Sequence, residues 1–284
     1  MDTGPGIEGV RFVPAPPDVR PWAAGAVTVN LPPAVARSVF PASVAGMLVV
    51  RFEGRSRGDH GGWLPAATLH GPSATPTQFS QQGPVRACGL LLAPQAVMLV
   101  AGLSNRWAAS GEAVDLNAVQ AGWGDRLQDR LAAAPSDLAR CDLLFTWLRA
   151  VIAARPAVTE RARVSGRLVP LLAQGLDAAC AELGLGARQL ERRCLDGLGM
   201  SPRRAHAVLR MQAALRSALR EPPGQTGADL AVAHDYCDQS HMGRDMRRLA
   251  GAPLGRIVVA SRQPKPGDDF WAFNVGRQQV RHPG

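Results

Sequence analysis

Short apolar runs separated by Pro and Gly clusters follow one another in the first third of the chain. They cover residues 26–31, 46–52, 67–69, 77–79 and 85–92. Runs of this length and spacing are typical of β-strands. Several of them in succession predict a small antiparallel β-barrel or sandwich. Residues 1–25 are rich in Pro and Gly, so we expect them to form a flexible or loosely docked lead-in.

The apolar pattern changes to a helical period at Trp123. It predicts two amphipathic helices up to Ala154, divided at residues 135–137, where Ser136 or Asp137 is a natural N-cap. We expect these helices to pack on the sheet or to pair with a second subunit. Residues 155–166 are polar and are interrupted by a Pro, which indicates an interdomain linker.

Residues 168–198 carry the pattern of a helix, a tight turn at residues 184–186 and a second helix. In the second helix, Leu190 and Cys194 are spaced to face inward. The opposite face is polar and mostly cationic, with Arg188, Gln189, Glu191, Arg192 and Arg193.

Residues 229–257 repeat the arrangement. A short apolar helix breaks at residues 235–237, and Asp238 then stands where an N-cap belongs. Apolar residues follow at helical spacing and are predicted to face inward: Met242, Met246 and Leu249. The other face carries Gln239, Ser240, Arg244, Arg247 and Arg248. Such a helix, held across a turn by a first helix, has the geometry that enters a DNA major groove.

Residues 202–220 predict one helix between these two segments, about 28 Å long at 1.5 Å per residue. It ends before Glu221-Pro222-Pro223-Gly224. A rigid spacer of this kind can hold two recognition helices about one duplex turn apart, so that they enter successive major grooves. Two such segments in one chain would contact an asymmetric DNA site.

Charge is unevenly distributed along the chain, whose formal net charge is +9. Residues 1–160 contain 13 Arg and 12 acidic residues, a net charge of +1, whereas residues 161–284 contain 18 Arg, Lys265 and 11 acidic residues, a net charge of +8. This asymmetry favours a polyanionic partner for the C-terminal part. Biased codon usage would explain the preference for Arg over Lys, but it does not explain the asymmetry.

At 284 residues, of which 46% are hydrophobic, the chain is predicted to form two domains. No apolar run approaches the roughly 20 residues that span a bilayer. The N-terminus lacks the pattern of a signal peptide, so we expect a cytoplasmic protein without a membrane partner. The five Cys are widely spaced and form no C-x-x-C pair, which favours small apolar residues in a reducing compartment.

The run Asp238-Gln239-Ser240-His241, followed by Arg244, Met246, Arg247-Arg248-Leu249 and Gly251-Ala252-Pro253, resembles the second helix-turn-helix of AraC/XylS-type transcription regulators. Gly199-Met200-Ser201-Pro202 resembles the Gly-x-Ser-Pro that closes the first module in that family. Asp235 replaces the family's turn Gly, and Asp tolerates the left-handed conformation better than most residues. Other departures are Met242 and Met246 for Phe, Gly186 for a capping Ser and Cys194 for Phe.

The resemblance implies a transcription regulator that binds double-stranded promoter DNA, with RNA polymerase as a further expected partner. The positions that match DNA-contacting residues of the family are Arg188, Glu191 and Arg192 in the first module, and Gln239, Ser240, His241 and Arg244 in the second. The alternatives for individual residues are a solvated Arg, a Glu191–Arg188 ion pair, and a His241 that caps the helix or packs internally.

The stretch from Leu64 to Leu116 resembles the cupin-like domain found ahead of such DNA-binding domains. The resemblance implies a small-molecule effector or contacts in a homodimer. Trp63 and Phe79 are the candidates to line an effector pocket, with a plain core position as the alternative. A metal site would need several His and a carboxylate, and this region offers only His60 and His70, with Asp59 and Glu53 nearby. The alternative for both His is a surface or hydrogen-bonded position, and we expect no cofactor.

The sequence therefore predicts an α+β protein: a small antiparallel β-barrel or sandwich with helices, then an all-α part with two helix-turn-helix modules joined by a long helix. The expected divisions are a sensor or dimerisation domain at 1–154, a linker at 155–166, a DNA-binding domain at 167–260 and a flexible tail at 261–284, whose patch at 270–273 is expected to dock on the body. A sequence-specific regulator without enzymatic activity is the leading hypothesis. The alternatives are a cupin-type metal-dependent enzyme fused to a DNA-binding domain, and a protein that coats DNA without specificity.

Overall fold

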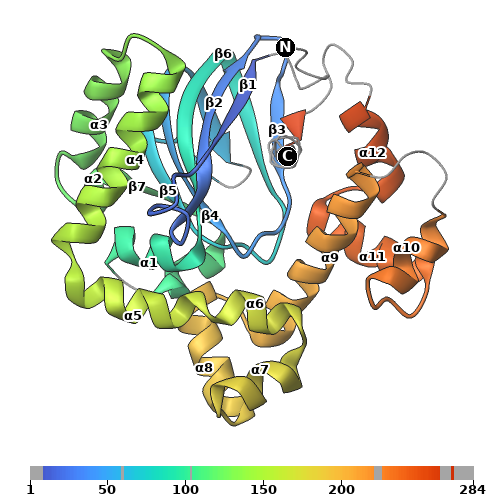
Figure 1. Ribbon diagram of the computed structural model, residues 1–284. Coiled ribbons are helices and arrows are strands. Elements are labelled where there is room, and N and C mark those ends of the chain that lie inside the picture. The colour runs from blue at the N-terminus through green and yellow to red at the C-terminus, as the bar shows by residue number, and fades with distance from the viewer. Residues whose placement is uncertain (1–8, 59–60, 103, 221–225, 263–269, 272–284) are drawn as a thin grey trace.

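The computed structural model describes residues 9–58, 61–102, 104–220, 226–262 and 270–271. An antiparallel sheet with helices on one face comes first in the chain, and an all-helical part follows (Figure 1). The predicted α+β class is confirmed. No helix in the described ranges has both the length and the apolarity needed to cross a membrane.

The strands pair in the order β1-β2-β6-β4-β5-β7, and β3 pairs with β6 on a separate branch. All of these pairs are antiparallel. A last strand, β8, pairs with β3 in parallel. The bounds are β1 Val10–Pro14, β2 Ala23–Leu31, β3 Arg37–Phe40, β4 Gly46–Gly58, β5 Ala67–His70, β6 Thr77–Leu92, β7 Ala113–Asp115 and β8 Phe270–Trp271.

The register of the sheet aligns one row of apolar side chains on the face that the helices cover. Leu48 of β4 pairs with Leu90 of β6 and with Leu69 of β5, and Leu90 pairs with Ala26 of β2. All four side chains are 0% exposed. Burying a Leu side chain completely contributes roughly 1.5–3 kcal/mol. Because neighbouring side chains along a strand alternate between faces, the residues next to this row face the other side, where the sheet is hollow.

Strand β6 is one strand of 16 residues, so the prediction of two strands at 77–79 and 85–92 is wrong. The Gly83-Pro84 pair bends the strand without ending it. Gly83 has a φ of +79° and faces Gly54 of β4, whose φ is +77°. A Cβ on Gly54 would lie 2.1 Å from the carbonyl oxygen of Pro84, so this close approach requires Gly. Gly83 and Pro84, which are typical of turns, therefore lie inside a continuous strand, although their sequence predicted a loop.

The lead-in at residues 1–25 is also different from the prediction. Strand β1 pairs along its length with β2, and Val19 and Trp22 are buried with 0% and 4% exposure. The Pro and Gly residues obscured the short alternating run of β1. Residues 1–8 lie outside the described residues.

Helices α3 Trp123–Ala132 and α4 Asp137–Ala154 confirm the two predicted amphipathic helices. Ser136 is the N-cap of α4, because its hydroxyl accepts a hydrogen bond from the backbone N–H of Ala139 at 3.2 Å. Both helices pack on the sheet (Figure 1). The other helices of this part are α1 Pro94–Ala101, the 3-10 helix η1 Asn105–Ser110 and α2 Leu116–Val119.

The segment predicted as an interdomain linker is helix α5 Pro156–Gly166, packed against α1. Pro156 occupies the first turn, where it removes no helical hydrogen bond. The Thr159 hydroxyl donates to the backbone carbonyls of Ile152 and Arg155. Pro156, which the sequence analysis interpreted as a break in structure, therefore starts a helix. The domain boundaries at 154 and 167 stay a prediction.

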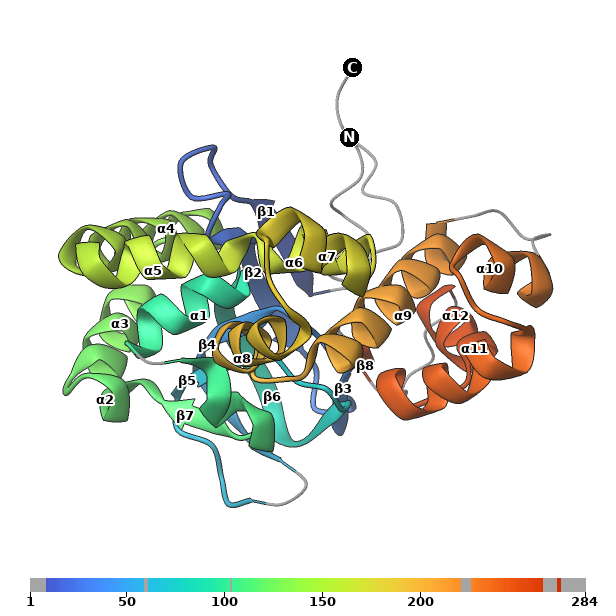
Figure 2. The same ribbon diagram turned by 90° about the horizontal axis from the view of Figure 1, so that it is seen from below.

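The C-terminal helices follow the predicted pattern. They are α6 Leu168–Ala173, α7 Leu176–Leu183, α8 Ala187–Leu198, α9 Pro202–Arg220, α10 Gly227–Ala233, α11 Gln239–Asp245, a π-helical turn η2 Met246–Ala250, and α12 Leu254–Arg262. Asp235 adopts a φ of 56° in the turn before α11, as its tolerance of the left-handed region predicts. Helix α9 runs between the two helix pairs (Figure 2).

Helix α12 continues to Arg262, two residues into the segment predicted as a flexible tail, and the flexibility of that segment stays a prediction. Residues Phe270 and Trp271 then form β8, which adds a parallel strand to β3. This pairing places the first two residues of the predicted docking patch on the sheet. Residues 263–269 and 272–284 lie outside the described residues.

Candidate nucleic-acid interface and adjoining cavity

Helix α8 presents the first set of predicted DNA-contacting residues. Gly186 precedes it in extended conformation, and the Gln189 side chain accepts from the Gly186 N–H at 3.2 Å. Leu190 and Cys194 point inward, with 2% and 0% exposure. Burial raises the pKa of Cys194 to about 12, so its thiol stays protonated in the core. The outward face carries the exposed side chains of Arg188, Glu191 and Arg192.

The alternative that Glu191 pairs with Arg188 is not seen, because no ion pair joins them in the described part of the chain. Both side chains, and that of Arg192, are exposed to solvent. A guanidinium that is not engaged by a carboxylate keeps its donors available for phosphate oxygens or guanine.

Helix α11 presents the second set. Asp238 is its N-cap, since the carboxylate accepts from the His241 backbone N–H at 2.7 Å. Met242 and Met246 are buried with 2% and 0% exposure, as predicted. Their burial leaves Gln239, Ser240 and Arg244 exposed on the outer face.

His241 differs from the other three residues of this set. Its side chain is only partly exposed, and its ring meets the ring of Tyr236 edge-on at 5.2 Å between centroids. The alternative that His241 packs internally therefore has structural support.

An ion-pair network centred on the buried carboxylate of Asp245 holds the second module on α9. Asp245 accepts from Arg210 of α9 at 3.1 Å and from Arg248 at 2.6 Å. The Arg210 guanidinium also lies 4.2 Å from the centroid of the Tyr236 ring. Removing one partner of a buried pair is far more destabilising than the net stabilisation that the pair provides. This network fixes the orientation of α11 relative to the long helix.

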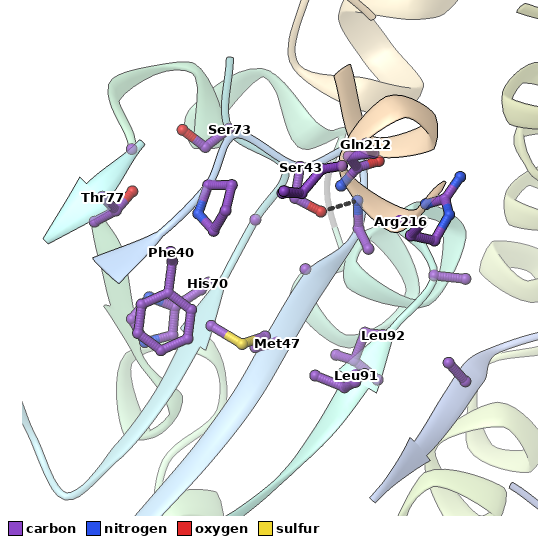
Figure 3. Close-up of a pocket in the computed structure, with 18 of the residues that line it drawn as sticks. Phe40, Ser43, Met47, His70, Ser73, Thr77, Leu91, Leu92, Gln212 and Arg216 are labelled. Carbon is purple, nitrogen blue, oxygen red and sulfur yellow. Dashed lines mark hydrogen bonds between the residues drawn. The ribbon is translucent and has the colours of Figure 1, made fainter. Parts of the chain in front are cut away.

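A cavity of about 530 Å³, which we call the outer chamber, lies between the sheet and α9 (Figure 3). Strands β3, β4 and β6 contribute Phe40, Met47 and Leu91 to its wall, and α9 contributes Leu215 and Arg216. Most of the wall is apolar. A cavity of this volume is large enough for a small organic ligand.

A second cavity of about 120 Å³, the inner chamber, continues into the hollow face of the sheet. The two chambers share the side chains of Phe40, Met47, His70, Phe79 and Leu91. Phe79 meets both Phe40 and His70 edge-on, at 5.4 Å and 5.5 Å between ring centroids.

Of the two predicted pocket residues, Phe79 lines both chambers and Trp63 lines neither. Trp63 is 40% exposed, and its ring is covered by Arg55 at 4.5 Å and by Arg57 at 5.7 Å. Cation–π contacts thus account for its position at the surface. Sequence reasoning missed Phe40 because β3 was not predicted, and it missed Leu215 because α9 was treated only as a spacer.

His60 and His70 are the histidines that a metal site in the N-terminal part would use. The described residues contain no group of three or more His, Cys, Asp or Glu that could hold a metal ion. His70 forms part of the cavity wall, and its Nε2 lies 3.0 Å from the Thr68 hydroxyl. Asp59 and His60 lie outside the described residues, so the hypothesis of a metal-dependent enzyme stays untested.

Comparison with protein families matches residues 179–257 to the helix-turn-helix domain. This range contains α8, α9 and α11. Residues 179–257 form an AraC-type helix-turn-helix domain. The chain therefore carries the DNA-binding domain of an AraC-type transcription regulator. No curated protein matches the chain.

Solved structures of ToxT are similar to most of this chain. The structure of wild-type ToxT from Vibrio cholerae strain SCE256 with bound unsaturated fatty acid has a TM-score of 0.50 and 9% identity, over 90% of this chain and 96% of that chain. ToxT from Vibrio cholerae O395 bound to (E)-4-(8-methylnaphthalen-1-yl)but-3-enoic acid has a TM-score of 0.47 and 8% identity, over 88% and 98% of the two chains. At such identities the likeness concerns the fold.

The AraC-type domain contacts the N-terminal part at both modules. In the first, Asn105 of η1 donates to the carbonyl of Gly197 at 2.7 Å, and Arg106 pairs with Asp196 at 2.6 Å. In the second, the backbone N–H of Ala42 donates to the carbonyl of Leu249 at 2.7 Å. Each contact lies close to one of the two recognition helices, so a shift of the sheet relative to α9 would disturb both.

The cavity wall yields a prediction about pH. Burial, with a smaller contribution from the charge of Arg51, lowers the pKa of His70 to about 4. An unfolded His binds a proton near pH 6.5. Because the unfolded state then binds more protons than the folded state, the free energy of unfolding should fall as the pH decreases from about 6.5 to about 4.

Urea denaturation at a series of pH values measures this dependence. His70→Gln should flatten the slope in that window, and the difference between the two proteins near pH 7.5, where His70 is neutral in both states, gives the packing change alone. An unchanged slope in His70→Gln would contradict the assignment.

Proposed function

We propose that this protein binds promoter DNA with sequence specificity by placing α8 and α11 in successive major grooves, and that a small apolar ligand in the outer chamber modulates this binding. The observation that carries the proposal is the position of α9. One face of this helix belongs to the core of both modules, and the residues at its C-terminal end close the chamber.

For DNA binding, the support comes from the two outward faces. Arg188 and Arg192 on α8, and Gln239, Ser240 and Arg244 on α11, are exposed while the apolar residues of both helices are buried. Arg donates two hydrogen bonds to guanine, and Gln and Ser complete contacts to base edges. Glu191 and His241 are included in the proposed DNA-contacting set. The ring of His241 packs partly on Tyr236, so fewer of its atoms are available for DNA.

For ligand control, the support comes from the chamber and from a relative. Unsaturated fatty acid is bound to the ToxT whose fold is similar. Here the chamber offers an apolar wall with three exposed arginines at its rim: Arg20, Arg216 and Arg220. A ligand that touches both the sheet and α9 shifts the population of arrangements in which the modules are placed for DNA. Homodimer formation and contact with RNA polymerase stay predictions.

Base contact by single residues is tested with Arg192→Ala and Arg244→Ala. Each should lose about 1–3 kcal/mol of binding free energy on the cognate site and much less on unrelated DNA, because bidentate contacts to guanine discriminate between bases. Fluorescence anisotropy at fixed salt, with cognate and random duplexes, measures both affinities. Arg130→Ala removes the same charge from exposed α3 and should leave both affinities unchanged. Equal losses on the two duplexes would instead make the residues phosphate contacts.

Two-groove binding is tested by the spacing of the half-sites. Inserting about five base pairs rotates one half-site by about half a turn, onto the far side of the duplex. Helix α9 is continuous over its 19 residues and cannot stretch to follow. Affinity should drop to that of a single module, and Arg244→Ala should then have little further effect. Equal binding to the native and spaced sites would mean that only one module engages DNA.

A further inference from the structure

The inner chamber contains a buried cation without a counter-ion. Arg51 of β4 lines this chamber and is 7% exposed. Its Nη1 donates to the backbone carbonyl of Pro65 at 3.1 Å, and no carboxylate pairs with it in the described part of the chain. Glu53, two residues further along β4, faces Arg86 at the surface. A buried charge is costly unless it is paired, and among the described residues the Arg51 guanidinium has one hydrogen-bond acceptor, the Pro65 carbonyl, and no carboxylate partner.

The neighbouring polar groups of the chamber are already satisfied by one another. Gln81 donates through Nε2 to the Ser38 hydroxyl at 2.9 Å, and the Ser56 hydroxyl donates to the Gln81 carbonyl oxygen. His70, on the adjacent strand, is held neutral near pH 7 because burial and the charge of Arg51 lower its pKa to about 4. The site therefore carries one positive charge, which favours a singly charged anion.

The residues between the inner chamber and α9 favour a ligand with an apolar body attached to that anion. Phe40, Met47 and Phe79 stand where the inner chamber opens into the outer one. Beyond them, Leu215 and Leu219 of α9 form the far wall. The arginines of the rim are more exposed to solvent than Arg51, although partial burial lowers the pKa of Arg216, so they gain less from an anion than Arg51 does.

We propose that the inner chamber is a carboxylate site, in which Arg51 pairs with the acid group of the ligand while the apolar body of the ligand passes Phe40 and Phe79 and ends against α9. This inference rests on the proposed ligand-dependent function and adds the ligand class and its orientation. The acid group lies inside the sheet, and the tail lies at the helix that carries both DNA-binding modules.

The experiment compares oleic acid with oleyl alcohol, which has the same chain without the charge, by calorimetric titration of the full chain. The unaltered protein should bind oleic acid about 10- to 100-fold more tightly than oleyl alcohol, because a charge-assisted hydrogen bond contributes a binding free energy of that size. Arg51→Gln should abolish this preference while the affinity for the alcohol stays the same. Arg130→Gln, on α3 and in the wall of neither chamber, is the matched control and should keep the preference. Arg216→Gln tests the rim as the other position for the acid group, and it should also keep the preference if the acid group pairs with Arg51.

A second readout is the titration of His70 followed by NMR in the unaltered protein. A carboxylate beside Arg51 cancels the charge that opposes protonation, so oleic acid should raise the pKa of His70, whereas oleyl alcohol should not. This measurement and the comparison of acid with alcohol test whether the acid group lies beside Arg51 even if Arg51→Gln does not fold.

Three results would overturn the inference: a preference for the acid that survives in Arg51→Gln, a preference lost in Arg216→Gln, or equal binding of acid and alcohol by the unaltered protein with no change at His70. In each of these cases the proposed ligand control stands, since an apolar ligand still binds. Failure of the unaltered protein to bind either probe would instead remove the ligand from the proposed function.

Discussion

Helix α9 is the element on which both the DNA-binding modules and the cavity depend. Val208, Met211 and Ala214 are 0% exposed and belong to one apolar cluster that also contains residues of both modules and of strand β3. Full burial of a side chain such as Met contributes roughly 1.5–3 kcal/mol, so detaching either module from α9 is costly. The same helix presents Leu215 to the chamber. The positions of α8 and α11 and the shape of the cavity are therefore set by one rigid body.

The AraC-type domain contacts the N-terminal part through the apolar side chains of Val39, Ala42 and Val44 and through a small number of polar contacts. The Ala42–Leu249 hydrogen bond, the Arg106–Asp196 ion pair and the short β8 pairing hold the two together. Exposed ion pairs of this kind contribute little, about 0–1 kcal/mol each. The polar contacts are therefore weak compared with the apolar cluster, and the proposed ligand control requires only a binding energy that differs between two arrangements of these parts.

The C-terminal half could be predicted from the sequence in detail, because each signal there is local. Asp238 caps α11, and Asp235 accepts the left-handed turn, for reasons that lie within a few residues. In the N-terminal half, the sequence predicted strands within β2, β4 and β5 and the helices α3 and α4, but it did not predict β1, β3 or the full length of β6. Gly83 looked like the end of a strand because its partner, Gly54, is 29 residues away. The cavity joins α9 to β3 and β4 across still longer separations, so Arg51 gave no signal until the fold placed it inside the sheet without a carboxylate.

The central claim is that the chamber and the DNA-binding surface are coupled through α9, and thermodynamic linkage gives its most direct test. If oleic acid changes the affinity for cognate DNA, then DNA must change the affinity for oleic acid by the same factor. Titrating oleic acid into the free protein and into the saturated protein–DNA complex should give dissociation constants that differ by about 5-fold or more. Equal dissociation constants in the two titrations, with oleic acid bound in both, would contradict the coupling.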